Sequence, residues 1–592
     1  MKSLITAALT GVLVLGAAAP LATAAEPVTQ CSASRPGGPF AIDGACVDPT
    51  YSNPVIDKRT NSDGLLLVEG HFEGPGTTFK IFLPPKSEWE GRFFQFTYPI
   101  NGQEPADNVQ FGAAHGGYTV QTDGALGYRH SAAAAKFART VAAEYYGVKS
   151  ENIYGYLYGW SGGSYPTVGA IENTRDVWQG AVPIVQGIPT SSAANFTSRA
   201  FAAFVLQDKK DQIVDALRPG GSGDPYSGLD AVQKAALEEV TRLGLPLESW
   251  EDFDYVANPG GLPSTAALVQ GFDTSYVEDF WTKPGYLGTE DSSLGELFRA
   301  ALAQDPSRRS HLALIANHRY TLPAQESSIP GFDQYRSPDD APLYPQRQFS
   351  PGPFLANLLT GGGSYSGKIT GKVIALDATL DSDAFPVHAA WYANRVEAAM
   401  GSEAKDSYRL WYTDNADHGP FNRPGQTTRL VGYMPVIYQA LEDVSAWAEE
   451  GIAPPRSTQY AVTPDNQIEL PGNAAARAGI QPVVDLSGRG GSDRIEVAEG
   501  TETDLQAKIQ VPPHTGKVVS VEWDFEGDGT FEPATFTANK DTLVVRATHR
   551  FKTAGTYFPS IRVGSQREGN ATDKFSVIQN VDRVRVVVTP AR

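Results

Sequence analysis

The chain of 592 residues is poor in cysteine and methionine, and it has no run of basic residues. Its formal net charge of −19 comes from interspersed acidic and basic residues, which argues against a nucleic-acid partner and against anionic membrane surfaces. No segment after the N-terminal stretch reaches the roughly 18 consecutive apolar residues of a membrane span, so we expect no membrane insertion. No glycine-rich run precedes a Lys-Ser/Thr pair, which argues against a P-loop.

The N-terminus has the features of a secretory signal. Residues 1–24 contain a short basic region, an apolar stretch and an A-x-A cleavage site that ends at Ala24. We therefore expect cleavage near Ala24 and a secreted mature protein. In an oxidising compartment the only two cysteines, Cys31 and Cys46, are expected to form a disulfide that staples the mature N-terminus.

The most informative motif is Gly-x-Ser-x-Gly at residues 159–163, directly after the apolar run at residues 153–158. A strand that turns sharply into a helix needs glycines two residues before and after the serine, where side chains would clash. The residues that follow have helical spacing, with a proline in the first turn. This context predicts a nucleophile elbow that exposes the Ser161 hydroxyl above a sheet. The alternative is a structural glycine-serine turn.

A histidine should follow the nucleophile and the acid in this chain order. The sequence has nine histidines, and those before Ser161 are excluded by order. Most of the others lie in an insertion-like stretch or in the C-terminal region, and His388 lies on an expected helix. His418 follows a β-rich run at residues 408–413, so it is placed on a loop from which an imidazole can reach the elbow. The alternative is a loop histidine that caps a turn.

The acid is expected after the preceding strand, residues 372–376. Three aspartates follow or end that run: Asp377, Asp381 and Asp383. Asp381 is predicted as the triad acid because its turn has the usual pattern of an aspartate followed shortly by a proline. Asp383 is the alternative, and Asp377 fits a strand-end residue or turn cap. The chemistry needs one buried carboxylate to hold the histidine Nδ1–H and stabilise the imidazolium.

Several further motifs occur in a set order and spacing: residues 83–95, 117–123, 142–147, 389–396 and 408–410. Together with the elbow they resemble the tannase and feruloyl esterase family of α/β-hydrolases. The resemblance implies that fold and the hydrolysis of carboxylic esters. The cysteines that many members place beside the serine and histidine are absent, and residues 97–102 replace the family's glycine-rich run. The chain therefore resembles a divergent branch, and the polyphenol substrates of the family are not carried over.

Two backbone amides are predicted to form the oxyanion hole. One is the N–H of Gly162, which follows the nucleophile at the N-terminus of the elbow helix. Alignment with the family's glycine-rich run places the other near Tyr98. Pro99 is excluded because it has no N–H to donate.

The alternation of strands and helices predicts a largely parallel α/β-hydrolase sheet, interrupted after its sixth strand by a mostly helical lid insertion. Helices are expected in this insertion over residues 231–244 and 294–304. Its acidic residues, such as Asp273 and Asp279, lack the spacing of a calcium loop and fit a solvated surface better. The expected divisions are an N-terminal segment at 25–63, the catalytic domain at 64–190 and 366–453, and the lid insertion at 191–365.

After a linker at residues 454–474, short β-runs separated by turns predict an all-β sandwich over residues 475–592. Trp523 with the turn at residues 524–529, and the later Gly-Thr-Tyr at residues 555–557, resemble a PKD-type immunoglobulin-like module. The resemblance implies a spacer or a module that contacts a surface or a polysaccharide. The Pro-Pro pair that opens the linker predicts few contacts across the boundary.

These observations favour a secreted serine carboxylic-ester hydrolase that acts through Ser161, His418 and Asp381. The expected substrate is a small-molecule or polymer-linked ester, and no cofactor or metal ion is expected. The alternatives are a secreted serine exopeptidase of the same fold and a binding protein with a relic hydrolase domain. The intact triad in the correct order weighs against the relic. The sequence has no N-terminal propeller pattern and no identifiable acidic pair to bind a substrate amine, and this argues against the exopeptidase.

Overall fold

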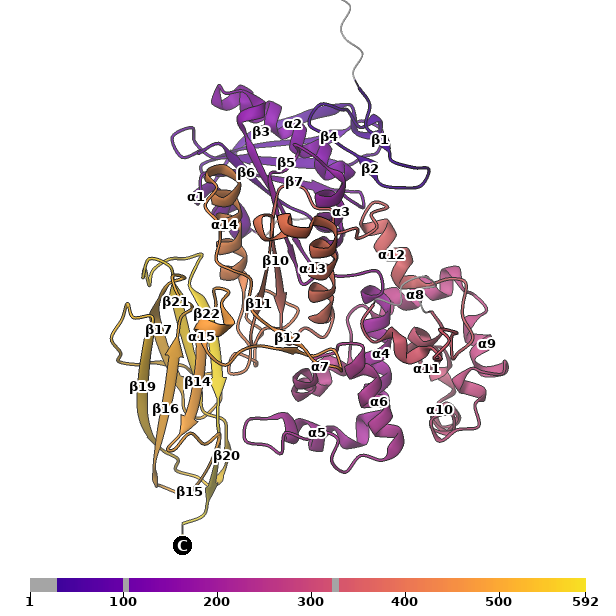
Figure 1. Cartoon of the computed structure of the whole chain (residues 1–592), viewed down its shortest axis with the longest axis vertical. Coiled ribbons are helices and arrows are strands. Elements are labelled where there is room, and N and C mark those ends of the chain that lie inside the picture. Colours follow the sequence, from indigo (N-terminus) through magenta and orange to yellow (C-terminus); the bar gives the residue numbers. More distant parts are fainter. Residues whose placement is uncertain (1–28, 100–105, 322–328, 592) are drawn as a thin grey trace, which may run out of the picture.

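A nine-stranded sheet extends from the top to the middle of the molecule in the view of Figure 1, and we call it the central sheet. The computed structural model describes residues 29–99, 106–321 and 329–591. The strand order is β11-β10-β9-β8-β6-β7-β5-β4-β3. The strands are β3 (Pro54–Ser62), β4 (Leu65–Phe72), β5 (Thr78–Leu83), β6 (Arg92–Phe96), β7 (Gly117–Asp123), β8 (Tyr154–Trp160), β9 (Gly180–Ile184), β10 (Lys372–Ala378) and β11 (Tyr408–Thr413).

The six strands from β11 to β7 are parallel, and β5, β4 and β3 continue the sheet as an antiparallel meander. Alternate side chains of the parallel strands enter two separate apolar cores, as the two-residue period of a strand requires. One core includes helices α2 (Arg129–Tyr146), α3 (Ser164–Asn173) and α13 (Val387–Met400), and the other includes α1 (Ala106–Ala114) and α14 (Met434–Glu450). The predicted α/β-hydrolase class is confirmed.

The N-terminal segment is joined to this sheet. Strand β3 pairs with β4 over its whole length, although the sequence places residues 54–62 outside the catalytic domain. The strand is hard to recognise because as an edge strand it is mostly exposed and carries polar residues, as edge strands often do. The predicted disulfide between Cys31 and Cys46 is present, and both cysteines are buried. The predicted signal at residues 1–24 lies outside the described residues.

Helices fill the insertion between β9 and β10 and have a core of their own. They are α4 (Ser191–Leu206), α5 (Lys210–Leu217), α6 (Ala231–Arg242), α7 (Phe253–Ala257), α8 (Leu262–Phe272), α9 (Tyr276–Thr282), α10 (Ser293–Gln304), α11 (Arg309–Ile315) and α12 (Pro351–Leu359). The two predicted helices correspond to α6 and α10. Helix α4 is buried along most of its length and contacts most of the others, so the insertion is built around it. No helix in the described ranges has the length and apolarity that a membrane crossing requires.

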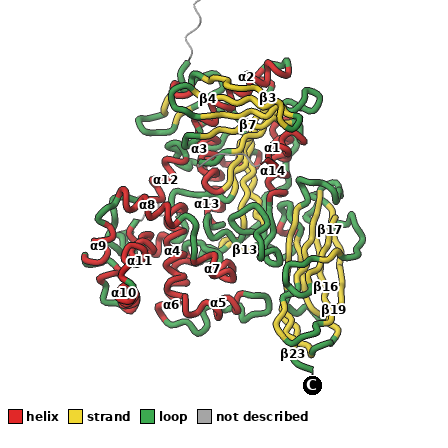
Figure 2. The backbone as a smooth tube through the Cα atoms, turned by 180° about the vertical axis from the view of Figure 1, so that it is seen from behind, coloured by secondary structure: helices red, strands yellow, loops and turns green. Residues whose placement is uncertain are grey.

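The C-terminal region is the all-β sandwich that the sequence predicts, and its apolar core includes Trp523. Its strands are β14 (Val483–Gly488), β15 (Arg494–Ala498), β16 (Glu502–Gln510), β17 (Lys517–Asp524), β18 (Glu532–Pro533), β19 (Thr542–Arg550), β20 (Gly555–Tyr557), β21 (Ser560–Gln566), β22 (Ile578–Arg583) and β23 (Arg585–Thr589). Below the central sheet, the helical insertion and the sandwich lie on opposite sides (Figures 1 and 2).

The segment between the hydrolase and the sandwich is not a free linker. It runs along β11, where the Thr458 N–H donates to the Leu410 carbonyl over 2.9 Å and the Tyr412 N–H donates to the Thr458 hydroxyl over 3.1 Å. It thereby covers the open edge of the sheet, which would otherwise present unpaired backbone groups. The sandwich itself is fastened to helix α14 by an ion pair between Arg567 and Asp443. The prediction of few contacts across this boundary is wrong.

Candidate active site

Ser161 lies at a sharp turn between β8 and α3. Its φ of 53° is in the left-handed region, which non-glycine residues rarely adopt. A side chain at Gly159 would place its Cβ 2.5 Å from the Thr97 carbonyl oxygen, and one at Gly163 would come within 2.2 Å of the same atom. Only glycine fits at both positions. These clashes are the physical reason for the Gly-x-Ser-x-Gly pattern, and the turn they allow holds the Ser161 hydroxyl at the end of a buried strand.

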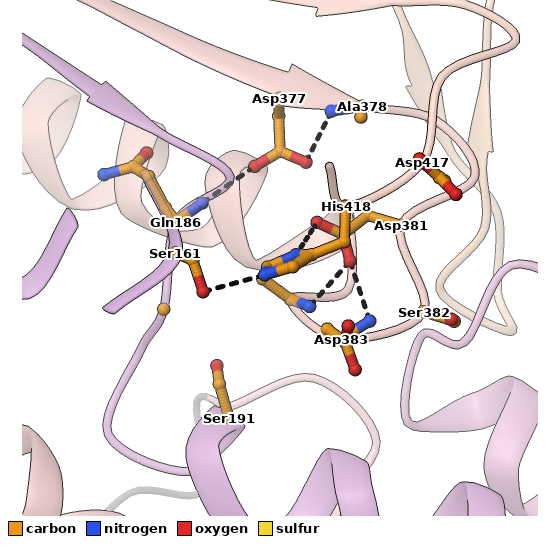
Figure 3. Close-up of polar contacts among 12 residues, drawn as sticks. Ser161, Gln186, Ser191, Asp377, Ala378, Asp381, Ser382, Asp383, Asp417 and His418 are labelled. Atoms are coloured by element: carbon orange, nitrogen blue, oxygen red, sulfur yellow. Dashed lines mark hydrogen bonds and ion pairs between the residues drawn. The ribbon is translucent and has the colours of Figure 1, made fainter. Parts of the chain in front are cut away.

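The three predicted triad side chains meet at this turn (Figure 3). His418 Nε2 is 2.7 Å from the Ser161 hydroxyl oxygen, and His418 Nδ1 is 2.7 Å from Asp381 Oδ2. In the neutral ring, the Nδ1–H donates to the carboxylate and Nε2 accepts from the serine hydroxyl. The arrangement is therefore a continuous hydrogen-bonded path from a buried carboxylate to a serine hydroxyl, and it can move a proton off Ser161.

Asp381 is fixed by its own loop. We call residues 379–384, after β10, the acid loop. The second carboxylate oxygen of Asp381 accepts from the backbone N–H of Asp383 over 2.7 Å and of Ala384 over 2.8 Å, and the side chain is fully buried. Three donors therefore hold the carboxylate, which leaves one orientation for the oxygen that faces the histidine.

The two other candidate aspartates have different partners. Asp383 forms an ion pair of 2.6 Å with the buried Arg199 of α4 and accepts from the Tyr255 hydroxyl over 3.1 Å. Asp377 accepts from the backbone N–H groups of Gln186 and Ala378 in the sheet, which is the strand-end role that the sequence suggests. Of the three carboxylates, only that of Asp381 is hydrogen-bonded to the histidine ring.

Charge around the ring changes the basicity of His418. Burial lowers its pKa, but the carboxylates of Asp381 and Asp383, together with the hydrogen bond that the ring donates to Asp381, outweigh burial and raise the pKa to about 9. Arg199 opposes this increase. Burial also raises the pKa of Asp417, the residue before the histidine, although Arg423 lowers it. The site is therefore an acidic environment in which the imidazolium form is stabilised.

The two segments that carry the predicted oxyanion donors approach each other closely. The Thr97 N–H donates to the Tyr158 carbonyl over 2.9 Å, so the Tyr98 amide is the next one along the loop after β6. A Cβ at Gly162 would lie 3.0 Å from the Pro99 ring and 3.7 Å from the Tyr98 ring, which shows how closely the two segments approach. The roles of the Gly162 and Tyr98 amides stay predictions.

Two aromatic rings lie near Trp160, the residue before the predicted nucleophile. Trp160, directly before Ser161, lies 4.5 Å from Phe96 and 6.1 Å from Phe421, measured between ring centroids. Phe421 follows the histidine by three residues and is 53% exposed. This exposed ring is available to contact a molecule that binds near Trp160.

Two residues near the triad are missed by reasoning from the sequence. Arg199 is fully buried and binds the acid loop through Asp383 and the Ser382 carbonyl. The Tyr433 hydroxyl donates to the His418 carbonyl over 2.9 Å. Neither belongs to a motif, and Arg199 lies on α4 of the insertion, 183 residues before Ser382 in the sequence, so no local pattern identifies it.

The acidic residues considered for calcium have a different partner. Asp273 and Asp279 both form ion pairs with Arg347, the second over 2.7 Å. Within the described ranges, no group of three or more histidine, cysteine or acidic side chains is arranged to hold a metal ion.

No protein-family model matches this chain, and no curated protein matches its sequence. Similar solved structures include feruloyl esterase B from Aspergillus oryzae, at 14% identity over 66% of this chain and 81% of that chain, with a TM-score of 0.35. A tannin acyl hydrolase from Aspergillus niger has 14% identity over 70% of this chain and 85% of that chain, with a TM-score of 0.32. The PKD domain of an M14-like peptidase from a Thermoplasmatales archaeon covers 19% of this chain and 100% of its own length at 14% identity, with a TM-score of 0.14.

Proposed function

We propose that this protein is a secreted serine hydrolase of carboxylic esters. The observation that carries the proposal is the relay from Asp381 through His418 to Ser161, with 2.7 Å at each step, at a serine whose backbone φ is 53°. A histidine that only caps a turn needs neither a buried carboxylate behind it nor a strained serine in front of it. This pairing of nucleophile, base and orienting acid is the arrangement that acyl transfer requires.

The reaction proceeds in two halves. The Ser161 oxygen attacks the ester carbonyl carbon while its proton passes to His418 Nε2, and Asp381 stabilises the resulting imidazolium. The oxygen of the tetrahedral intermediate is held by the backbone N–H groups of Gly162 and Tyr98. His418 then gives its proton to the departing alcohol, which leaves an acyl-serine. A water then attacks the acyl-serine while His418 accepts its proton. His418 returns this proton to the Ser161 oxygen as the carboxylic acid is released.

The substrate in this proposal is a small-molecule or polymer-linked ester. The exposed ring of Phe421 near Trp160 supports an ester with a bulky group, because these rings would contact it beside the nucleophile. The same proposal includes contact between the C-terminal sandwich and a polymer or polysaccharide. The test therefore includes both small and polymeric esters.

The test is a panel of p-nitrophenyl, feruloyl, galloyl and polyester substrates, with an aminoacyl anilide as the exopeptidase arm, on the purified protein. We expect hydrolysis of at least one ester class. Ser161→Ala should lower kcat by about 10⁶ with an unchanged melting temperature, because removal of the nucleophile leaves no cavity. His418→Ala should lower it to a similar extent. Turnover of the anilide alone, or unchanged ester turnover by Ser161→Ala, would contradict the proposal.

A further inference from the structure

The catalytic histidine is carried by a short segment, residues 414–418 after β11, which we call the histidine loop. From the hydrolase side, the loop is held by the Leu380 N–H, which donates to the Ala416 carbonyl over 2.9 Å, and by the Val431 N–H, which donates to the Asn415 carbonyl over 2.8 Å. Asn415 has a φ of 51°. A non-glycine residue in this region costs free energy and persists only where its surroundings fix it.

The C-terminal sandwich supplies the contacts that fix the Asn415 side chain. The Asn415 Nδ2 donates to the Asn580 side-chain oxygen over 3.0 Å and to the Val581 carbonyl over 2.9 Å. Asn580 is buried, and its own Nδ2 donates to the Pro482 carbonyl over 2.8 Å. Its amide therefore has one orientation, and strand β22 presents two fixed acceptors to the histidine loop.

The residue before Asn415 is held by a second amide from the same region. The Gln481 side-chain oxygen accepts from the Asp414 N–H over 2.7 Å, and its Nε2 donates to the Asp414 carbonyl over 3.0 Å. Gln481 is only 4% exposed. The Asp414 carboxylate forms an ion pair of 2.7 Å with Arg477. The backbone and the side chain of Asp414 are thus both bound by residues that follow the hydrolase in the sequence.

Apolar packing closes the same interface. Ile578 and Val581 of the sandwich belong to the apolar core that covers one face of the central sheet, together with Ala416 of the histidine loop. A loop enclosed in this way cannot change its course without opening the core. Reactive groups held by packed elements are positioned more accurately than groups on free loops.

We propose that the C-terminal sandwich is a part of the catalytic unit that positions His418, with Gln481 and Asn580 as its positioning residues. The inference rests on the proposed ester hydrolysis. The two amides fix the 414–415 turn, and this turn sets the place of the imidazole between Ser161 and Asp381. Loss of these contacts should change the chemical step more than substrate binding, because they act through the histidine and touch no substrate.

Asn415→Gly is the most direct test, because glycine accepts the positive φ while the two bonds to the sandwich are lost. The side-chain oxygen of Asn580 stays hydrogen-bonded in this variant, because it also accepts from the Val581 N–H over 2.8 Å. The matched control is Asn466→Gly. Asn466 also has a positive φ, of 63°, and its Nδ2 donates over 2.6 Å to the Arg242 carbonyl of the insertion. The two variants therefore make the same chemical change at two different contacts.

We expect Asn415→Gly to lower kcat by about 10- to 100-fold with little change in KM, because small misplacements of a reacting group have effects of this size. Asn466→Gly should keep the kcat of the unmodified chain. The NMR signal of the His418 Nδ1 proton, hydrogen-bonded to Asp381, should be lost or shifted in Asn415→Gly and unchanged in the control. Gln481→Leu, which removes the other amide at nearly constant volume, should repeat the result if Asn415→Gly does not fold.

The inference is overturned if folded Asn415→Gly and Gln481→Leu both keep kcat and the proton signal, or if Asn466→Gly loses as much activity as Asn415→Gly. This failure differs from failure of the proposed function. Retained ester turnover in Ser161→Ala removes the hydrolase mechanism itself, whereas a dead Ser161→Ala with an unaffected Asn415→Gly removes only the role of the sandwich.

Discussion

The helical insertion and the C-terminal sandwich both approach the triad, but they hold different parts of it by different chemistry. The insertion grips the acid loop with a buried charge, since Arg199 binds Asp383 over 2.6 Å and the Ser382 carbonyl over 2.8 Å. The sandwich grips the histidine loop chiefly with the neutral amides of Gln481 and Asn580. A buried charge changes the pKa of nearby groups, whereas an amide holds position with little effect on charge. The insertion therefore affects chiefly the pKa of His418, whereas the sandwich affects chiefly its position.

The largest effect expected from a change in the acid loop tests which of its aspartates is the triad acid. Asp381→Asn should lower kcat by about 10⁴, because the amide stabilises the wrong tautomer of His418. Asp383→Asn is the matched control and should cost far less, since that side chain pairs with Arg199 instead of the ring. Steady-state kinetics on one ester decide the matter. A larger loss in Asp383→Asn would move the triad acid to that residue.

A second prediction concerns the predicted oxyanion hole, which is formed by the central sheet and its loops and not by the insertion or the sandwich. Tyr98→Pro should lower kcat by about 10² or more, because proline has no N–H for the oxyanion. Tyr98→Phe should leave kcat nearly unchanged, since the donor is backbone. Equal activity of the proline and phenylalanine variants would show that the second oxyanion donor lies elsewhere.

Stability should differ between the charged contact and the neutral one. Arg199→Met should lower the free energy of unfolding by about 3–5 kcal/mol, because it leaves Asp383 partly buried without its cation. Asn415→Gly should lower it by only about 1–2 kcal/mol, because it removes two neutral hydrogen bonds of about 1 kcal/mol each. Urea unfolding of both variants measures the difference. Similar losses of unfolding free energy in the two variants would contradict the distinction between the charged contact of the insertion and the neutral contacts of the sandwich.

The smallest expected effect is on pH dependence. His418 must be neutral to accept the serine proton, and its pKa is raised to about 9, so kcat/KM should increase with pH and level off only above that value. Asp383→Asn removes one cause of the increase and should move the midpoint to lower pH. Gln481→Leu should leave the midpoint in place while it lowers the plateau. A midpoint near pH 6.5 in the unmodified chain would show that the carboxylates do not act on the ring as described.

The sequence predicts those parts of the molecule that depend on neighbours along the chain. Gly159 and Gly163 identify the elbow because their spacing around Ser161 can be read within five residues, although the Thr97 carbonyl oxygen that they avoid follows the neighbouring strand β6. The choice between Asp381 and Asp383 stays open in the sequence, since both follow the same strand. The folded chain distinguishes the two aspartates, because Arg199 of the insertion forms an ion pair with Asp383, and this contact cannot be read from the sequence.

The role of the C-terminal region was harder to predict. A proline pair after a helix is typical of a linker, and nothing in the sequence shows that the residues after it cover the edge of β11. Gln481 and Asn580 are single amides in a β-rich region, with no motif that connects them to a histidine loop far earlier in the chain. Long-range contacts between polar residues leave no periodic signal in a sequence.

Labelling with a fluorophosphonate tests most directly whether Ser161 is a nucleophile activated by His418. We expect one adduct, on the peptide that contains Ser161, when the labelled protein is digested and analysed by mass spectrometry. The adduct should be absent in Ser161→Ala and should form far more slowly in His418→Ala. An adduct on another residue, or labelling of Ser161→Ala at the rate of the unmodified protein, would contradict this role of Ser161.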